Sequence, residues 1–256
     1  MDAVSVTAEP PRIRGAGNCE SEWTRSRWLQ ALPGTEADRW LTGVRRLVLV
    51  SPHPDDEVLG CGGLIRTARD LGIEVHVISV TDGEACYPHS ERWNAERLRH
   101  TRRTELVAAL EGLGVASDRI ALLDVGDGRV AEHEAALAAS LHDLLRAGDR
   151  VLTTWRGDGH PDHEATARAV EHAVRSRDIG MQQFPVWAWH WMSPDVPQPG
   201  FADALRVRLS NDVCAAKRRA LACFVSQFDS GEPGVPAILP SKVRQRFERD
   251  YEVVLP

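Results

Sequence analysis

One imidazole and three carboxylates follow one another closely in the stretch Ser51–Glu57, which reads Ser-Pro-His-Pro-Asp-Asp-Glu. An apolar run, Leu47–Val50, precedes the stretch, and residues 58–65 lead into a segment with a helix-like pattern. The charged stretch therefore lies where a buried strand passes into a helix. In open α/β sheets, ligands bind in the crevice at the carboxyl ends of the strands. A turn does not need this many charged residues, so the stretch indicates a binding or catalytic site.

A second cluster, His160-Pro161-Asp162-His163, comes shortly after another predicted strand, residues 150–155. Because loops that follow parallel strands lie at one edge of a sheet, the two clusters can converge although they are far apart in the chain. Two imidazoles and one carboxylate, with coordination positions left open, make a catalytic metal site. Zinc takes such nitrogen and oxygen ligands and lowers the pKa of bound water to about 7.

The spacing within each cluster leaves several roles open. Pro161 suits the first position of a helix, where its missing N–H is no loss. His163 would then lie in the first helical turn and His160 just before it, so one imidazole can bind metal while the other handles a proton or an oxyanion. Neighbouring Asp55 and Asp56 should point in different directions, so one can ligate while the other faces metal-bound water. The plainer alternative is that both clusters only cap or begin helices.

Strand and helix patterns alternate at βαβ spacing, which predicts a single α/β domain whose mostly parallel sheet carries helices on both faces. The predicted strands are residues 45–51, 73–81, 120–123, 150–155, 186–191 and 204–209. The predicted helices are residues 58–71, 95–113, 130–146, 161–177 and a helix capped by Asn211 that runs to about 224. A short helix and a final strand are expected in residues 238–256. Residues 1–40 are assigned to an N-terminal arm with short helices, and residues 41–256 to the main domain.

The composition of the chain argues against several classes of protein. The 256 residues carry 31 Lys and Arg against 37 Asp and Glu, a formal net charge of −6. An acidic chain without a basic stripe is not expected to bind nucleic acid. Five scattered cysteines without a CxxC pair predict reduced thiols and a cytoplasmic location. No apolar run reaches the roughly 18 residues of a membrane helix, and we expect no signal peptide.

Three more polar residues are expected at the rim of the site as substrate contacts: Asp82, Glu84 and Arg92. Ordinary surface charge is the alternative for each of them. The run Gly60-Cys61-Gly62-Gly63 does not match G-x-G-x-x-G, so a dinucleotide site is not expected. Those glycines instead predict a close approach of the helix to the sheet.

The two clusters together resemble the paired motifs of a known family. Pro52-His53-Pro54-Asp55-Asp56-Glu57 with His160-Pro161-Asp162-His163 is similar to the LmbE-like, or PIG-L, superfamily of zinc-dependent N-deacetylases, and the likeness runs from about Arg45 to Gln227. The resemblance implies a Rossmann-like fold and one Zn²⁺ per chain, with other divalent ions possible. It also implies a small glycosylated molecule as the substrate and leaves the oligomeric state open.

The resemblance also implies a role for each residue of the two motifs. The zinc ligands that it implies are His53, Asp56 and His163. It implies that Asp55 is the general base, and that His160 assists the oxyanion or the leaving group, oriented by Asp162. One position departs from the mycothiol-pathway members, which carry a tyrosine two positions before the first histidine of the second motif. Asp158 stands there, so the resemblance does not extend to a mycothiol precursor or to a tyrosine at the oxyanion.

The expected activity is removal of an acyl group, acetyl above all, from an amino sugar or its glycoconjugate. The nearest alternative is an amidase of the same family that cleaves thiol conjugates. A second alternative is an Fe(II)/2-oxoglutarate oxygenase, since His53, Asp55 and His163 satisfy a two-histidine, one-carboxylate pattern. Those enzymes resemble a jelly-roll β fold, which the strand–helix alternation disfavours. A binding module without catalysis would leave the charge at residues 53–56 unexplained.

Overall fold

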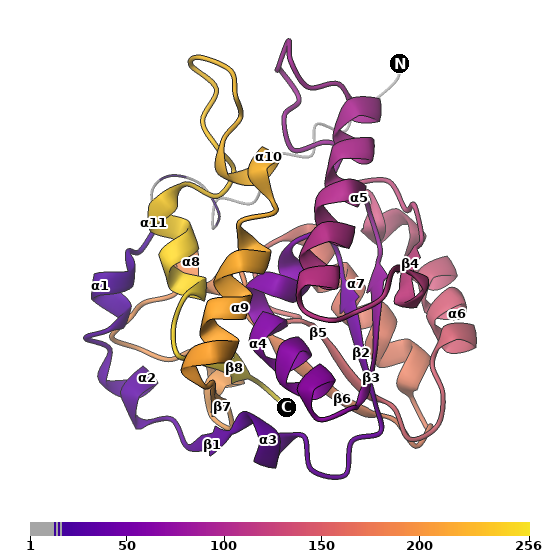
Figure 1. The fold of residues 1–256 in the computed structure, drawn as a ribbon, viewed down its shortest axis with the longest axis vertical. Coiled ribbons are helices and arrows are strands. Elements are labelled where there is room, and N and C mark those ends of the chain that lie inside the picture. Colours follow the sequence, from indigo (N-terminus) through magenta and orange to yellow (C-terminus); the bar gives the residue numbers. More distant parts are fainter. Residues whose placement is uncertain (1–12, 14, 16) are drawn as a thin grey trace.

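The computed structural model describes residues 13, 15 and 17–256, and a parallel sheet lies at its centre (Figure 1). The order of the five strands that the described residues place in this sheet is β4-β3-β2-β5-β6. Their bounds are β2 (Arg46–Ser51), β3 (Glu74–Ser79), β4 (Ile120–Leu122), β5 (Arg150–Thr154) and β6 (Gly180–Phe184). Every neighbouring pair runs parallel. The predicted α/β architecture with a mostly parallel sheet is confirmed.

Helices cover both faces of the sheet because the central strand β2 is apolar on both sides. Leu47 and Leu49 pack into one buried cluster, whereas Val48 and Val50 pack into another on the opposite face. A strand that is buried on both faces has a continuous apolar run instead of an alternating one. The first cluster includes residues of α4 (Asp56–Asp70), α5 (Ala95–Gly112) and α9 (Asn211–Leu221), and the second includes residues of α6 (Glu134–Leu144) and α7 (Pro161–Val174).

Helix α4 approaches its neighbours closely through its glycines. A Cβ atom built on Gly60 would lie 2.1 Å from the ring of Phe184, and one built on Gly63 would lie 2.4 Å from the side chain of Leu209. No side chain larger than hydrogen fits at such distances. The expected close approach of this helix to the sheet is confirmed, and it places the first residues of α4 directly over the end of β2.

A second, smaller sheet joins the ends of the described chain. Its order is β1-β7-β8, with β1 parallel to β7 and β8 antiparallel to it. The bounds are β1 (Gly34–Glu36), β7 (Leu205–Arg208) and β8 (Tyr251–Val254). Just after β8, Leu255 forms a bridge to Gln183 of β6, which links the two sheets. The final strand expected near the end of the sequence is therefore present.

The remaining elements are short. They are α1 (Glu20–Trp23), α2 (Arg27–Ala31), α3 (Ala37–Trp40), α8 (Ala188–Trp191), α10 (Val225–Phe228), α11 (Ser241–Arg244), η2 (Ser117–Arg119), η3 (Val130–His133), η4 (Pro199–Phe201) and η5 (Gln245–Phe247). The N-terminal helices pack on the main domain, and Trp23 is fully buried in its larger core cluster. Much of the predicted N-terminal arm lies outside the described residues.

The strand predicted over residues 186–191 is wrong. Strand β6 ends at Phe184, and the aromatic segment that follows turns into the short helix α8. The backbone N–H groups of residues 186–188 donate to the carboxylate of Asp158 and not to a neighbouring strand. A buried carboxylate that accepts three successive N–H groups holds the chain in a turn.

The predicted cap of α9 is also wrong, by one residue. Ser210 is the cap, and its Oγ accepts a hydrogen bond from the N–H of Val213, while Asn211 is already helical. The helix predicted over residues 130–146 is divided into η3 and α6. These shifts change helix ends and leave the order of elements as expected.

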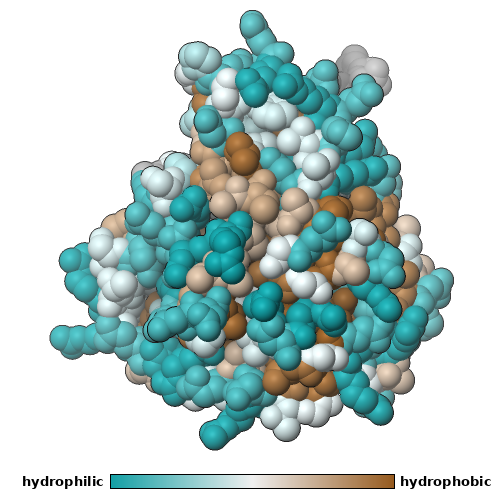
Figure 2. Space-filling view, viewed as in Figure 1, coloured by the Kyte–Doolittle hydropathy of each residue, from teal (hydrophilic) through white to brown (hydrophobic). Residues whose placement is uncertain are grey.

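Hydrophilic residues predominate on the face seen in Figure 2, with smaller apolar patches between them. Among the residues that the structure describes, none of the helices combines the length and the apolar composition needed to cross a bilayer. All five cysteines are free thiols.

Candidate metal centre and catalytic site

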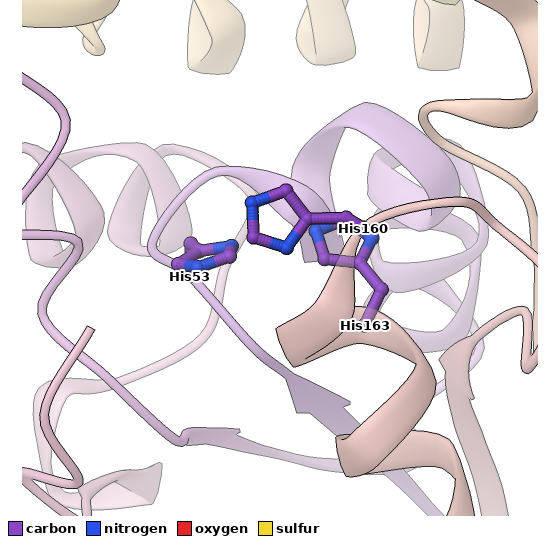
Figure 3. Close-up of side chains that lie close together, drawn as sticks. All are labelled: His53, His160 and His163. Carbon is purple, nitrogen blue, oxygen red and sulfur yellow. The ribbon is translucent and has the colours of Figure 1, made fainter. Parts of the chain in front are cut away.

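The two charged clusters converge at one edge of the sheet. His53 lies in the turn between β2 and α4, and His160 and His163 lie at the start of α7, which follows β5 (Figure 3). Because β2 and β5 are adjacent, the ring of His53 comes within 4.9 Å of the ring of His160 and 5.3 Å of that of His163, centroid to centroid. The convergence expected from the sequence is therefore present.

His53 and His163 each place a ring nitrogen near the carboxylate of Asp56. Oδ2 of Asp56 lies 3.2 Å from Nδ1 of His53 and 3.2 Å from Nε2 of His163. Tetrahedral bonds of about 2.1 Å would separate neighbouring ligand atoms by about 3.4 Å. Nε2 of His163 is buried, and it has no hydrogen-bond partner within the described part of the chain. A divalent metal ion fits these donors, because it would supply the partner that this nitrogen lacks.

Two other groupings bring possible ligand atoms close together: His53 with His160 and His163, and His53 with Asp127 and Asp162. The hydrogen bonds favour the centre at Asp56 over both. Nε2 of His53 lies 3.1 Å from Asp127 and 3.3 Å from Asp162, so this nitrogen can donate to them and leave Nδ1 for a metal ion. Nδ1 faces Asp56 at 3.2 Å, and the other two carboxylates hold the ring from behind.

His163 is held in the same manner by Asp158. Nδ1 of His163 donates to Oδ2 of Asp158 at 2.8 Å, and both side chains are fully buried. A carboxylate on the outer nitrogen of a metal-binding histidine fixes its tautomer and its orientation. The sequence showed Asp158 only as a departure from a family pattern. Its place five residues before His163, in the loop that leads into α7, is the signal that could have revealed its role.

Asp55 occupies the N-cap position of α4 without capping it. Its side chain makes no capping hydrogen bond, and its φ of 127° is one that residues other than glycine rarely adopt. The carboxylate instead pairs with Arg102, whose Nη2 lies 3.0 Å from Oδ2 and whose side chain is buried. Burial raises the pKa of Asp55 to about 7, against the opposing charge of Arg102. The capping alternative is therefore wrong for Asp55, and Arg102 is a site residue that the sequence did not reveal.

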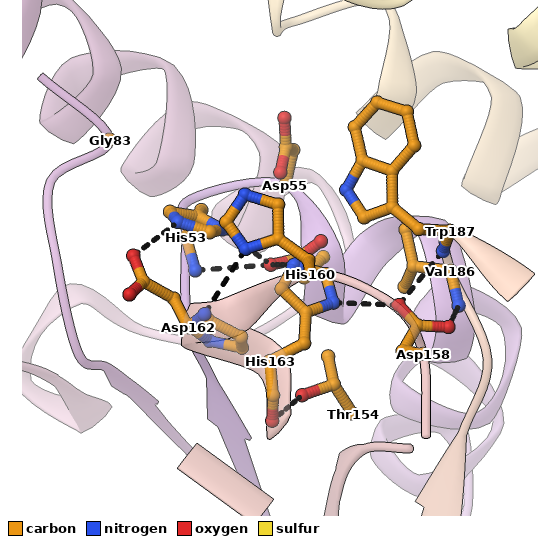
Figure 4. A network of polar contacts seen from close by, with 12 residues as sticks. His53, Asp55, Gly83, Thr154, Asp158, His160, Asp162, His163, Val186 and Trp187 are labelled. Atoms are coloured by element: carbon orange, nitrogen blue, oxygen red, sulfur yellow. Dashed lines mark hydrogen bonds and ion pairs between the residues drawn. The ribbon is translucent and has the colours of Figure 1, made fainter. Parts of the chain in front are cut away.

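His160 is a neutral imidazole with one N–H available. Burial and the charges of His163 and His53 lower the pKa of His160 to about 3. Nδ1 accepts a hydrogen bond from the backbone N–H of Asp162 at 3.2 Å, which leaves the proton on Nε2. Figure 4 shows this ring between His53 and Trp187. It can donate a hydrogen bond to a ligand oxygen.

The carboxylate of Asp162 does not orient His160 as expected. It accepts hydrogen bonds from the backbone N–H groups of Gly128 and Val130, and one oxygen lies 3.3 Å from Nε2 of His53. The start of α7 at Pro161 turns this side chain toward the loop after β4, so Asp162 supports the opposite histidine.

The surroundings of His53 and Asp56 favour the charged form of each side chain. Burial lowers the pKa of His53, but hydrogen bonds to Asp127, Asp162 and Asp56 outweigh burial and raise it well above its usual value. Burial raises the pKa of Asp56, but the charge of His163 and hydrogen bonds to both histidines hold it far below its usual range. Protons and a metal ion therefore compete for the same donors.

Two of the three expected rim residues do not face the site. Asp82 is buried, and both of its oxygens accept hydrogen bonds from the guanidinium of Arg103. Arg92 is exposed on an outer loop, where its guanidinium lies 5.3 Å from the ring of Trp93. Glu84 does lie near the site: its Oε1 is 3.4 Å from the backbone nitrogen of Asp127. The pairing of Asp82 with Arg103 is a contact that local sequence does not reveal.

Trp187 is an aromatic side chain at the site that the sequence did not single out. Its indole lies nearly parallel to the ring of His160, at 6.5 Å between centroids and an interplanar angle of 23°. In Figure 4 it rises beside His160 on the same side as Asp55. The residue is half-buried.

Residues 48–174 match the family model PIG-L, described as GlcNAc-PI de-N-acetylase. Over these residues, which include both motifs, the chain is similar to the PIG-L, or LmbE-like, family. It is 35% identical over 186 residues to the 1D-myo-inositol 2-acetamido-2-deoxy-α-D-glucopyranoside deacetylase of Mycolicibacterium gilvum (strain PYR-GCK). That similarity covers 61% of this chain and 63% of the relative, so this chain spans less than two thirds of the relative's length.

Solved structures share the fold at lower identity. A deacetylase of teicoplanin biosynthesis superposes with a TM-score of 0.63 at 22% identity, covering 82% of this chain and 97% of that one. The 4-carboxy-2-hydroxymuconate hydratase of Pseudomonas putida KT2440 superposes with a TM-score of 0.54 at 21% identity, covering 72% and 80%. The fold therefore hosts more than one reaction, and the side chains of the site must carry the argument about activity.

Proposed function

We propose that this chain is a zinc-dependent hydrolase that removes an N-acyl group, acetyl above all, from an amino sugar or its glycoconjugate. The observation that carries the proposal is the arrangement of donors at the end of β2. Nδ1 of His53 and Nε2 of His163 each lie 3.2 Å from Oδ2 of Asp56, and Arg102 holds the carboxylate of the next residue, Asp55. A metal ion with a neighbouring general base can catalyse hydrolysis.

In this proposal His53, Asp56 and His163 hold the zinc ion, which supplies a Lewis acid and a bound water of lowered pKa. Asp55 accepts the proton of the attacking water, and burial keeps its pKa at about 7, close to that of an effective base at neutral pH. Arg102 holds the carboxylate of Asp55 in place.

His160 serves the oxygen of the amide. Because its pKa is lowered and its Nε2 carries a proton, His160 donates a hydrogen bond to the oxygen on which negative charge develops. Asp55 then passes the proton it has taken to the leaving nitrogen as the C–N bond breaks. The products are acetate and the free amine.

The sugar nature of the substrate rests on the relatives and on Trp187. The curated relative named above acts on an acetamido-glucopyranoside, as its name states. The half-buried indole of Trp187 next to His160 is an aromatic side chain on which a sugar ring can pack. The jelly-roll oxygenase alternative does not agree with a parallel sheet covered by helices. A thiol-conjugate amidase would share the fold, so only the substrate that is cleaved distinguishes it from an amino-sugar deacetylase.

A mass-spectrometric screen tests the proposal. The purified protein is incubated with N-acetylglucosaminides, N-acetylated peptides, acylated thiol conjugates and hydratable unsaturated acids, and zinc is measured by elemental analysis. We expect acetate and a free amino sugar, one zinc per chain, and loss of both zinc and activity in His163→Ala. Hydrolysis of peptides alone, hydration without amide cleavage, or full zinc in His163→Ala would contradict it.

A further inference from the structure

Residues 17–23 of the N-terminal segment pack against helix α8, which follows Trp187. Trp23 is fully buried, and its ring lies edge-on to the ring of Trp189 in α8, at 5.0 Å between centroids. Gly17 passes His190 so closely that a Cβ atom built on it would lie 2.4 Å from the imidazole ring. The segment and α8 both lie outside residues 48–174, which match the family model, so the match does not describe this contact.

The segment also satisfies carbonyl groups at the end of α8. A helix leaves its last carbonyl groups without partners inside the helix, and one of four residues is not stable alone. The indole N–H of Trp23 donates to the carbonyl of Trp189 at 2.8 Å. The backbone N–H of Asn18 donates to the carbonyl of His190 at 3.0 Å, and its side-chain amide donates to that of Met192. Asn18 and Trp23 therefore hold the end of α8 in place.

The beginning of α8 is held by Asp158. The carboxylate of Asp158 accepts hydrogen bonds from the backbone N–H groups of residues 186–188, and its carbonyl accepts one from the indole N–H of Trp191 at 2.7 Å. The same carboxylate accepts the Nδ1 proton of His163 at 2.8 Å (Figure 4). Hydrogen bonds thus connect the N-terminal segment, through α8 and Asp158, to one of the proposed metal ligands.

We infer that Trp23 and Asn18 are positioning residues of the metal centre, which act through α8 and Asp158 on His163. Asp158 is fully buried, and its carboxylate binds α8 and the His163 ring at once. A shift of α8 therefore moves the carboxylate and turns the ring away from the direction in which it binds metal. The inference rests on the metal ligands of the proposed function.

Trp28 offers a matched control for Trp23. It lies in α2, and its ring is edge-on to that of Trp23 at 5.8 Å between centroids. Its indole Nε1 is buried and has no hydrogen-bond partner within the part of the chain that the structure describes. Phenylalanine at either position removes one indole N–H and the same part of the ring, but only Trp23→Phe removes a hydrogen bond to α8.

The zinc affinity of these variants, measured by competition with a chelator of known affinity, tests the inference. Loss of a direct carboxylate partner of a metal-binding histidine costs about 10–100-fold in metal affinity, so we expect a smaller loss of about 3–10-fold in Trp23→Phe. Trp28→Phe should bind zinc like the wild-type protein. Absorption spectra of the Co²⁺-substituted proteins, which report the ligand geometry, should change in Trp23→Phe and not in Trp28→Phe.

Asn18→Ala repeats the test at a half-buried residue and decides it even if Trp23→Phe does not fold. It removes the hydrogen bond to Met192 and should also weaken zinc binding. Wild-type affinity in Asn18→Ala, or in a folded Trp23→Phe, would overturn this inference alone. So would an equal loss in Trp23→Phe and Trp28→Phe, since both would then act through general stability. A wild-type protein that binds no zinc would overturn the proposed function as well.

Discussion

Adjacent residues of the same type have opposite electrostatic environments at this site. Asp56 lies between two histidines, whose charge and hydrogen bonds hold its pKa far below the usual range despite burial. Asp55 is buried and pairs with Arg102, and burial raises its pKa to about 7. Its φ of 127° is a backbone conformation that residues other than glycine rarely adopt. Two aspartates can therefore divide the roles of ligand and base.

The first prediction separates these two aspartates by mutation. Asp55→Asn should keep the metal, because no proposed ligand is lost, while kcat falls by about 10²–10⁴-fold, as is typical when a general base is removed. Asp56→Ala should lose metal and activity together. Elemental analysis and steady-state kinetics on the same samples measure both. An Asp55→Asn protein with full metal and near-normal turnover would move the role of base elsewhere.

The second prediction concerns pH. Asp55 accepts a proton only when it is ionised, and its pKa of about 7 lies above the usual value of 3.8 for an aspartate. The value of kcat/KM should therefore rise with pH through about 7 and fall about tenfold per pH unit below it. Metal content is measured at each pH, because protons also compete for the histidine ligands. With metal retained throughout, an acidic limb centred near pH 4 would show that an ordinary, unshifted carboxylate is the base.

At the scale of elements, the site depends on how closely α4 packs. Gly60 lies one turn beyond Asp56 and faces Phe184 of β6, so the small residue lets the helix approach the strand next to the site. Loop 185–191 follows the same strand and carries both Trp187 and the N–H groups that hold Asp158. Strand β6 therefore positions both α4, which packs against it, and residues 185–191, which follow it, around the metal centre.

The third prediction compares two helical glycines. Gly60→Ala should lower the free energy of unfolding by about 1–3 kcal/mol, because its Cβ would fall 2.1 Å from the Phe184 ring and force the helix or the ring to move. Gly112→Ala, at the end of α5, meets no atom within 4 Å and should be neutral or stabilise the protein by up to about 1 kcal/mol. Urea unfolding measures both. Equal effects in the two variants would contradict the close-packing argument.

At the scale of the whole molecule, a buried ion pair ties the small sheet to the large domain. Glu252 of β8 accepts hydrogen bonds from the backbone N–H groups of Gly63 and Leu64 in α4, and it pairs with Lys217 of α9. Both charged side chains are almost completely buried. The last strand is therefore anchored in the interior beneath the helices that carry the site.

The fourth prediction tests that anchor against a surface pair. Glu252→Gln leaves Lys217 buried without a counter-charge and should cost about 3–5 kcal/mol of unfolding free energy. Glu36→Gln breaks the exposed pair with Arg208, also in the small sheet, and should cost less than about 1 kcal/mol. Chemical denaturation of both variants gives the comparison. A loss at Glu252 no larger than that at Glu36 would mean that the buried pair does not anchor β8.

The sequence by itself determined the parts of this protein that local pattern encodes. Apolar runs identified β2, β3, β4 and β5 of the parallel sheet but not β6, whose sequence Gly-Met-Gln-Gln-Phe contains two glutamines. The two histidine-aspartate clusters after β2 and β5 identified the place of the site. These features depend on residue type and short spacing, because side-chain periodicity and turn chemistry act over a few residues. The cytoplasmic location and the assignment of residues 1–40 and 41–256 to separate parts stay predictions.

The tertiary structure alone decided which side chains meet at the site. Asp127 and Arg102 reach His53 and Asp55 from other elements, and Asp162 turns to His53 although it is a near neighbour of His160 in the chain. The same holds for loop 185–191, where a strand-like pattern bends because Asp158 binds its N–H groups. Such contacts join residues far apart in the chain. They depend on the order of strands in the sheet and on how helices pack, which no local pattern specifies.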